Sequence, residues 1–246
     1  RGLSLLALTD HDTTSGLSDF MNACAKEGVH GLCGVELSAD ADFTLHILCY
    51  RFKLGDAGME RQLDRIRKMR DDRNVQICEK LQAMYVDISI EEVTAAAGGE
   101  VVARPHFARL LTEKGYAGNI REAFDLFLKR GAPGYVSRER LSPEECIETI
   151  HNAGGLAVLA HPAQCRLDDD ELESLLKRLK DAGLWGIEAV YGTNTPEITY
   201  QHLKLADKYG LYATAGSDFH GNCGRGVDLG ISVSEDFLPW ARLGTR

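Results

Sequence analysis

Short apolar runs alternate with amphipathic stretches along much of this chain of 246 residues. Short apolar runs are typical of strands, and apolar residues three or four positions apart are typical of helices. The expected strands cover residues 4–9, 29–37, 43–51, 155–160, 185–191 and 211–217, and the expected helices cover 17–27, 168–181 and 197–208. This alternation predicts an α/β fold built on a parallel sheet or barrel.

The middle of the chain departs from this alternation. From residue 56 to 154 the apolar positions keep helical spacing in a strongly charged sequence. The first such stripe consists of Met59, Leu63, Ile66, Ile77, Leu81 and Met84. We therefore expect a barrel domain of residues 1–55 and 155–246, interrupted by a helical insertion domain of residues 56–154.

The first expected strand begins close to the start of the chain. Arg1-Gly2-Leu3 resembles the end of a helix–strand loop. We expect one further strand and one helix to precede Arg1 in the complete protein.

Charge and cysteine content narrow the class of partner. The net charge is −9, and an acidic chain lacks the positive field that long nucleic acids require, so no groove for long nucleic acid is expected. Bound cations and a few arginines can still hold a small phosphorylated ligand. No apolar run approaches the roughly 20 residues of a membrane span, and the seven cysteines include no C-x-x-C pair. This pattern indicates a cytoplasmic protein with reduced thiols that does not use a membrane.

Residues of the types that bind metals follow four of the expected strands. They stand in the segments Thr9-Asp10-His11-Asp12, Gly34-Val35-Glu36, Ala160-His161-Pro162 and Ser217-Asp218-Phe219-His220. A fifth candidate, His46, lies inside another strand-like run, residues 43–48. Divalent transition metals bind imidazole and carboxylate, and the active sites of barrels lie where the strands end. The convergence of these side chains predicts a metal cluster at one end of the sheet.

Each of these residues also has a simpler explanation when it is taken alone. Residues 10–12 could form a turn or a helix cap, and His46 could be a core histidine. His161 could be a strand terminus with a satisfied imidazole, and His220 could lie in an exposed loop. Their joint occurrence at the strand ends favours the metal cluster.

Two other charged segments are interpreted without a metal. Asp168-Asp169-Asp170 is typical of a helix start, where carboxylates suit the positive end of the helix dipole. Arg225, between two glycines, is interpreted as a loop residue, with contact to an anion as the alternative.

The combined motifs resemble the PHP (polymerase and histidinol phosphatase) superfamily. The resemblance rests on Thr9 to Thr13, Gly34-Val35-Glu36, Leu45-His46-Ile47, Leu159 to Pro162 and Gly216 to Gly221. Arg104-Pro105-His106 and Gly134-Tyr135-Val136 narrow it to the branch of the TrpH/YciV proteins. These act as 3',5'-nucleoside bisphosphate phosphatases and as 5'-to-3' exoribonucleases on short RNA.

The resemblance implies a distorted (β/α)7 TIM-like barrel with a helical insertion and a site for up to three divalent metals. Mn²⁺ is the expected ion, and Zn²⁺, Fe²⁺ and Mg²⁺ are the alternatives. By analogy, Glu36 would bridge two metals and His46 and His161 would complete the second position. Asp218 would bind the first metal, and His11 with His220 the third.

The same resemblance implies contacts with the substrate. Asp10 would touch the substrate or lie behind the metals, and Arg104 and His106 would reach a substrate phosphate, because a planar guanidinium matches phosphate oxygens. Protonation of the leaving group would fall to His220 or Asp10, and the sequence does not choose between them.

This chain departs from the family at its start. The family begins with a strand that carries His-x-His and a nearby Asp, and this sequence has neither. We interpret this as a missing N-terminal segment. For a chain that begins at Arg1, we expect the second metal position, with Glu36, His46 and His161, to bind most tightly and the activity to be very low.

The leading functional hypothesis is metal-dependent hydrolysis of a phosphate ester. Metal ions promote such reactions because they lower the pKa of bound water and take up charge on the phosphoryl oxygens. The expected substrates are 3',5'-nucleoside bisphosphates and short 5'-phosphorylated oligoribonucleotides. The alternatives are a histidinol-phosphatase-like phosphomonoesterase and a non-catalytic PHP module. The sequence makes no prediction of the oligomeric state.

Overall fold

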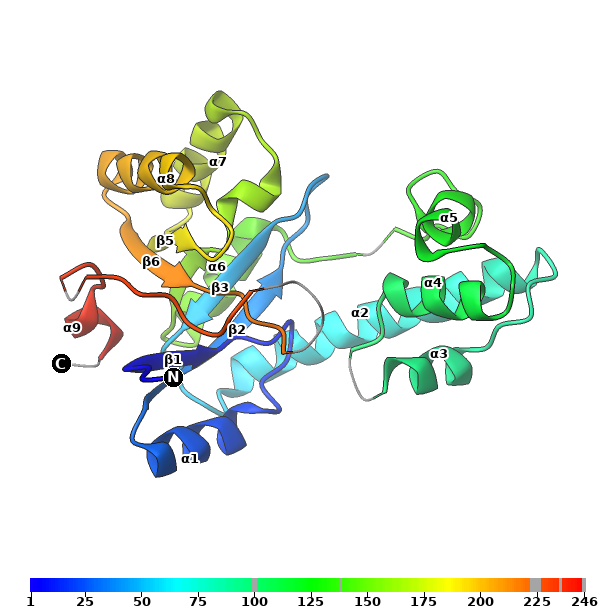
Figure 1. Cartoon of the computed structure of the whole chain (residues 1–246), viewed down its shortest axis with the longest axis horizontal. Helices are drawn as coiled ribbons and strands as arrows, with labels where there is room; N and C mark the ends of the chain where they lie inside the picture. Colours follow the sequence, from blue (N-terminus) through cyan, green and yellow to red (C-terminus); the bar gives the residue numbers. More distant parts are fainter. Residues whose placement is uncertain (99–100, 138, 222–226, 235, 245–246) are drawn as a thin grey trace. The chain divides into compact units, whose positions relative to one another are not determined.

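The computed structural model describes residues 1–98, 101–137, 139–221, 227–234 and 236–244 (Figure 1). The chain divides into two compact units, and each is described by itself. Unit 1 comprises Arg1–Asp64 and Arg140–Arg246, and unit 2 comprises Arg65–Glu139. Arg225 lies outside the described residues.

Unit 1 is built on a six-stranded sheet in which each strand lies beside the next one in the sequence. The strands are β1 (Leu5–Leu8), β2 (His30–Ser38), β3 (His46–Tyr50), β4 (Leu156–Leu159), β5 (Gly186–Tyr191) and β6 (Tyr212–Gly216). Each of them lies within an expected strand or within one residue of it. The expected α/β class is therefore confirmed.

The expected parallel pairing holds for only part of the sheet. β1 pairs with β2 in parallel and β4, β5 and β6 are parallel to one another, but β3 runs antiparallel to both of its neighbours. Residues 39–45 connect β2 to β3, and this connection is too short for the crossover that a parallel pair requires. The reversal places His46, the first residue of β3, opposite Ser38, the last residue of β2.

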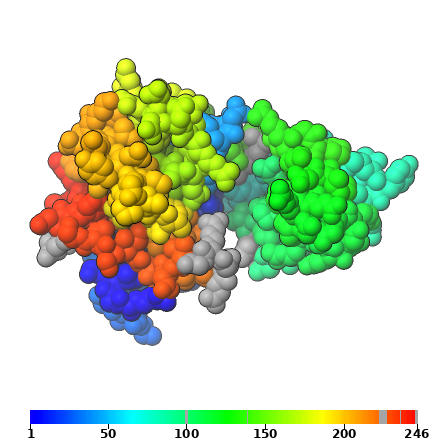
Figure 2. Space-filling view, turned by 45° about the horizontal axis from the view of Figure 1, so that its top comes forward, coloured from blue at the N-terminus to red at the C-terminus, as the bar shows by residue number. Residues whose placement is uncertain are grey.

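Helices cover the sheet of unit 1 on its outer side. They are α1 (Leu17–Glu27), α6 (Pro143–Asn152), α7 (Asp169–Asp181) and α8 (Pro196–Tyr209). The short C-terminal helix α9 (Trp240–Leu243) is described with the other face below. α1 packs on β2, α6 on β3 and β4, and α8 on β5. In the face of unit 1 shown in Figure 2, α7 (yellow-green) and α8 (yellow to orange) form part of the surface.

Asp168 is the N-cap of α7 and accepts a hydrogen bond from the backbone N–H of Glu171, so the interpretation of residues 168–170 as a helix start is confirmed.

Part of the core of unit 1 lies on the other face of the sheet. Residues two apart on a strand point to the same face, and this alternation gathers a cluster of Leu32, Leu48, Tyr50, Val158, Ala160 and Leu243. Leu243 comes from α9, so the C-terminal helix packs against residues of the sheet. Glu36 is the register partner of Leu48 on β3 and therefore shares this buried face.

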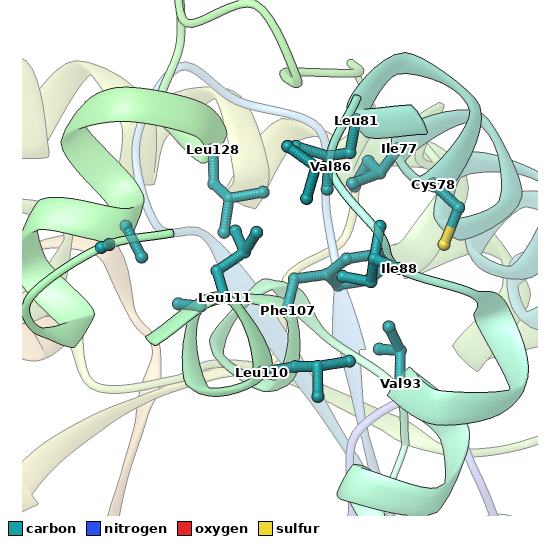
Figure 3. Packing of buried hydrophobic residues seen from close by; sticks show 13 residues of the cluster. Ile77, Cys78, Leu81, Val86, Ile88, Val93, Phe107, Leu110, Leu111 and Leu128 are labelled. Atoms are coloured by element: carbon teal, nitrogen blue, oxygen red, sulfur yellow. The ribbon is translucent and has the colours of Figure 1, made fainter. Parts of the chain in front are cut away.

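Unit 2 is helical. α2 (Ala57–Gln82) begins in unit 1 and continues into unit 2, where α3 (Ile90–Ala97), α4 (Arg104–Glu113), α5 (Ile120–Ala123) and the π-helical turn Phe124–Leu128 follow. Its core forms around Phe107, which is fully buried, with side chains from α2, α3 and α4 (Figure 3). The labelled members of this cluster are Ile77, Cys78, Leu81, Val86, Ile88, Val93, Phe107, Leu110, Leu111 and Leu128.

The compact unit of residues 65–139 lies within the expected insertion of residues 56–154. The difference arises at both ends, because the first turns of α2 and the whole of α6 belong to the unit that contains the sheet. A Ser142 cap starts α6: the Ser142 hydroxyl accepts from the N–H of Glu145, and the Glu145 carboxylate accepts from the N–H of Ser142. Among the described residues, no helix is long and apolar enough to cross a membrane.

Candidate metal centre

Three imidazoles surround the carboxylate of Glu36. His46 Nδ1 lies 2.8 Å from Glu36 Oε1, and His161 Nε2 lies 2.9 Å from the same oxygen. His11 Nδ1 lies 3.3 Å from the other carboxylate oxygen, Oε2. The structure thus brings together four of the six residues that the sequence nominates as metal ligands.

Four neighbouring strands, β1 to β4, place these side chains at one edge of the sheet. Glu36 lies near the end of β2, and His46 opens the antiparallel β3 beside it. His11 follows β1 and is bridged to Glu36, where the N–H of Asp12 donates to the carbonyl of Glu36 (2.9 Å). β4 ends at Leu159, and Ala160 and His161 follow it. The N–H of Ala160 donates to the carbonyl of His46 (3.1 Å). Backbone hydrogen bonds therefore fix all four positions relative to one another.

Burial and the neighbouring imidazoles shift the pKa of Glu36 in opposite directions. Its side chain is only 5% exposed, and burial alone would raise its pKa. Hydrogen bonds with His161 and His46, together with the charges of the imidazoles, hold the pKa of Glu36 well below its usual range. Burial alone would lower the pKa of His161, but its contact with Glu36 raises it. Glu36 is therefore a carboxylate that stays ionised in a buried place.

The donor set fits a divalent metal ion. Ligand atoms of His11, Glu36 and His46 all lie within 4.8 Å of one another. His46 Nδ1 and His161 Nε2 face each other at 3.2 Å and share one carboxylate oxygen, an arrangement that calls for a positive partner between them. Among the described residues, the buried His11 Nδ1 has no hydrogen-bond partner. Imidazole nitrogen and carboxylate oxygen are the donors that such ions accept.

Asp218 and His220 lie beyond the end of β6. Asp218 Oδ2 accepts a hydrogen bond of 2.7 Å from the hydroxyl of Tyr191, and His220 Nδ1 is 2.8 Å from the backbone carbonyl of Asp218. The ring centroids of His220 and His11 are 6.3 Å apart. Both residues therefore lie at the edge of the sheet where Glu36 lies. Their expected role as metal ligands stays a prediction.

The three residues expected to contact the substrate belong to different units. Asp10 precedes His11 on unit 1, and its side chain is exposed. Arg104 and His106 open α4 in unit 2: Arg104 donates to the carbonyl of Leu128 (3.3 Å), and its guanidinium lies over the ring of Tyr135. His106 is buried, and its Nδ1 accepts from the N–H of Ala103 (3.0 Å). The contact of these residues with a substrate stays a prediction.

Several polar residues to which sequence reasoning gave no role support the centre. Asp12 is fully buried and accepts from the N–H of Ser38 (3.0 Å) and its hydroxyl (3.1 Å). Glu188 on β5 is buried and accepts from the N–H of His161 (2.8 Å). Tyr191 receives a hydrogen bond of 2.6 Å from Gln164 and donates to Asp218. A carboxylate inside the apolar run of residues 185–191 was the available signal for Glu188.

A buried carboxylate that is ringed by imidazoles at one edge of an α/β sheet defines a divalent metal centre of the kind that metal-dependent hydrolases use. No model of a known protein family matches the chain. Among curated proteins, it is 35% identical over 244 residues to a 3',5'-nucleoside bisphosphate phosphatase of Chromobacterium violaceum, covering 98% of this chain and 85% of that protein. It is 32% identical over 242 residues to a 5'-3' exoribonuclease of Haemophilus influenzae, covering 97% of this chain and 88% of that protein.

Two solved structures are similar to this chain over most of its length. A structure from Chromobacterium violaceum, described as an amidohydrolase with bound sulfate and no metal, superposes with a TM-score of 0.83 at 34% identity and covers 98% of this chain and 86% of that one. A protein of Bifidobacterium adolescentis, proposed to be a metal-dependent phosphoesterase, superposes with a TM-score of 0.76 at 29% identity and covers 96% and 83%. The chain belongs to the PHP superfamily of metal-dependent phosphoesterases, in the branch of the nucleoside bisphosphate phosphatases and 5'-3' exoribonucleases.

Proposed function

We propose that this phosphoesterase hydrolyses a phosphate ester of 3',5'-nucleoside bisphosphates and acts on short 5'-phosphorylated oligoribonucleotides from the 5' end. The observation that carries the proposal is the buried Glu36 carboxylate with His46 and His161 on one of its oxygens. The names of the relatives from Chromobacterium violaceum and Haemophilus influenzae support the choice of substrates.

The residues have separate tasks in this proposal. Divalent metals, with Mn²⁺ proposed as the ion, would lower the pKa of water and offset charge on the phosphoryl oxygens. Glu36 would bridge two of them, with His46 and His161 at one position. His11, Asp218 and His220 would hold the remaining positions. Asp10 and His220 are the candidates for protonating the leaving group, since both lie at this edge of the sheet.

A pocket in unit 1 offers room for the nucleotide. Its volume is about 1000 Å³, at the upper end of the range that small-molecule sites occupy. Phe43, Thr44, Gln164, Arg166, Tyr191 and Asp218 contribute to its lining. Because Asp218 is also a proposed metal ligand, the pocket adjoins the centre. We propose that the Phe43 ring packs on the base and that the Arg166 guanidinium pairs with the phosphate that is not cleaved.

The decisive assay is release of inorganic phosphate from adenosine 3',5'-bisphosphate by the full-length protein with Mn²⁺ present. His161→Ala should reduce release to background, because it removes one imidazole from Glu36. His30→Ala is the matched control, since His30 is exposed at the opposite end of β2, and it should keep wild-type activity. Equal release by the His161→Ala and wild-type proteins would overturn the proposal.

Two comparisons separate the substrate classes. The ratio of kcat/KM for adenosine 3',5'-bisphosphate to that for histidinol phosphate should strongly favour the nucleotide, and the reverse would favour a histidinol-phosphatase-like enzyme. Arg166→Ala should raise KM for the bisphosphate and leave KM for p-nitrophenyl phosphate unchanged, because only the bisphosphate carries a second phosphate.

The finer features of fold and location belong to the same proposal. We propose that the six-stranded sheet is part of a distorted (β/α)7 barrel, which is supported by a strand order that follows the sequence. We also propose a cytoplasmic location, which is supported by the free thiols of Cys24, Cys33, Cys49, Cys78, Cys146 and Cys165. An experimental structure of the full-length protein and fractionation of the cells that make it would test these two points.

A further inference from the structure

We propose that Glu188 is a positioning residue that fixes the backbone of His161, and through it the imidazole at the metal centre, and that Gly216 is required to leave room for the Glu188 carboxylate. This inference rests on the metal centre of the proposed function. It adds two residues, from β5 and β6, that carry no proposed ligand atom.

His161 has an unusual backbone. Its φ is +27° and its ψ is 64°, in the left-handed region, which is unfavourable for a residue with a Cβ atom. Pro162 follows directly and opens a short 3-10 helix, so the chain turns sharply at the residue whose Nε2 must face Glu36. Such a conformation persists only where the surroundings hold it in place.

Glu188 supplies the hydrogen bond that holds this turn. The N–H of His161 donates to Glu188 Oε2 at 2.8 Å, and both residues are buried, with 4% of each exposed. A buried N–H that loses its acceptor is costly, so the acceptor determines where this N–H points. β5 lies beside β4 in the sheet, and therefore Glu188 reaches His161 from the neighbouring strand.

Gly216 completes the arrangement from β6. A Cβ atom at residue 216 would lie 1.9 Å from Glu188 Oε1 and 3.1 Å from Glu188 Cδ. The glycine is thus needed for space, since its φ is not among the positive values that would demand glycine for conformation. A methyl group at this position would displace the carboxylate that His161 depends on.

The test is the affinity for Mn²⁺, measured by equilibrium dialysis of the purified full-length protein, with the thermal unfolding of each metal-free variant recorded beside it. Glu188→Ala should weaken Mn²⁺ binding about 10- to 100-fold, the range seen when a residue that orients a metal ligand is removed. Glu188→Gln should keep the affinity within about 3-fold, because its side-chain oxygen can still accept from the His161 N–H.

Gly216→Ala should weaken binding as Glu188→Ala does, and it should add little in the Glu188→Ala background, because the carboxylate that it displaces is already gone. Gly58→Ala is the matched control. It adds a methyl group to unit 1 on α2, where the nearest atom is an Asp56 carboxylate oxygen at 3.0 Å, and it should leave the affinity unchanged.

Three results would overturn the inference. Glu188→Ala could bind Mn²⁺ as the wild type does while unfolding at a lower temperature, which would make Glu188 merely structural. Glu188→Gln could lose as much affinity as Glu188→Ala, which would mean that charge and not the hydrogen bond matters. Independent, additive losses in the double variant would show that Gly216 acts by another route. If Glu188→Ala does not fold, Glu188→Gln and Gly216→Ala still decide the matter. Failure of the wild type to bind Mn²⁺ would instead refute the metal centre of the proposed function.

Discussion

Glu188 should make the metal-free protein less stable as the pH rises from 5 to 8. The carboxylate is fully enclosed in unit 1, and burial, the largest effect, raises its pKa from the ordinary 4.5 to about 7. The hydrogen bond from the His161 N–H and the charge of His161 act in the opposite direction but are weaker. In the unfolded chain the same group would titrate near its ordinary value. Between these two pKa values the folded state therefore holds a proton that the unfolded state has lost.

The sign and size of the effect follow from this difference. Where the folded state binds more protons than the unfolded state, the free energy of unfolding falls with rising pH. The difference between 4.5 and about 7 corresponds to about 3 kcal/mol in all. Most of it, about 2–3 kcal/mol, is lost between pH 5 and pH 8, because part of the change lies below pH 5 and the effect is complete once the pH passes the folded pKa.

Urea unfolding of the wild type and of Glu188→Gln, both with a chelator present, isolates this contribution. Gln does not titrate, so the difference between the two free energies of unfolding cancels the other groups. We expect the wild type to lose about 2–3 kcal/mol relative to Glu188→Gln between pH 5 and pH 8. A difference that stays constant over this range, or that grows in favour of the wild type, would show that Glu188 is ionised throughout and would refute the reasoning.

Three further predictions concern packing, capping and thiol chemistry. Phe107→Ala should lower the free energy of unfolding by about 3–5 kcal/mol in urea titration, because Phe107 is fully buried in unit 2, and truncation of the exposed Leu126 to Ala should change it little. Ser142→Ala should lower the free energy of unfolding by about 1 kcal/mol, because it removes the hydroxyl that caps α6. Ser142→Asp should restore most of this stability in thermal unfolding. An Asp variant as unstable as the Ala variant would contradict the capping role. Burial raises the pKa of the Cys146 thiol far above its ordinary value, so little thiolate forms at pH 8. Peptide mapping should find Cys146 alkylated by iodoacetamide only after unfolding. Equal labelling of the native protein would show that the thiol is accessible.

The sequence determined the local elements and the set of polar residues at the strand ends. The helix Leu17–Glu27 has the bounds that its apolar spacing predicts, and Gly28 ends it in the left-handed conformation. The strands before His11 and His161 are equally local, because alternation and turn residues are read over a few positions. Metal-binding residue types after four of the expected strands, with His46 inside a fifth, were sufficient to expect His11, Glu36, His46 and His161 in one place. The structure brings these four together.

Only the tertiary structure decided which residues hold the ligands in position. The direction of β3 does not follow from its alternation, which is the same either way, but the short connection of residues 39–45 already excludes a parallel pair with β2. The antiparallel pairing is what places His46 beside Ser38. The sequence does not reveal the role of Glu188, because its contact with the His161 N–H forms only when β4 and β5 pair. The need for glycine at position 216 exists only because the Glu188 carboxylate occupies the space of a Cβ atom there. Such contacts join residues 27 and 28 positions apart, and no local pattern of hydrophobic and polar residues encodes them.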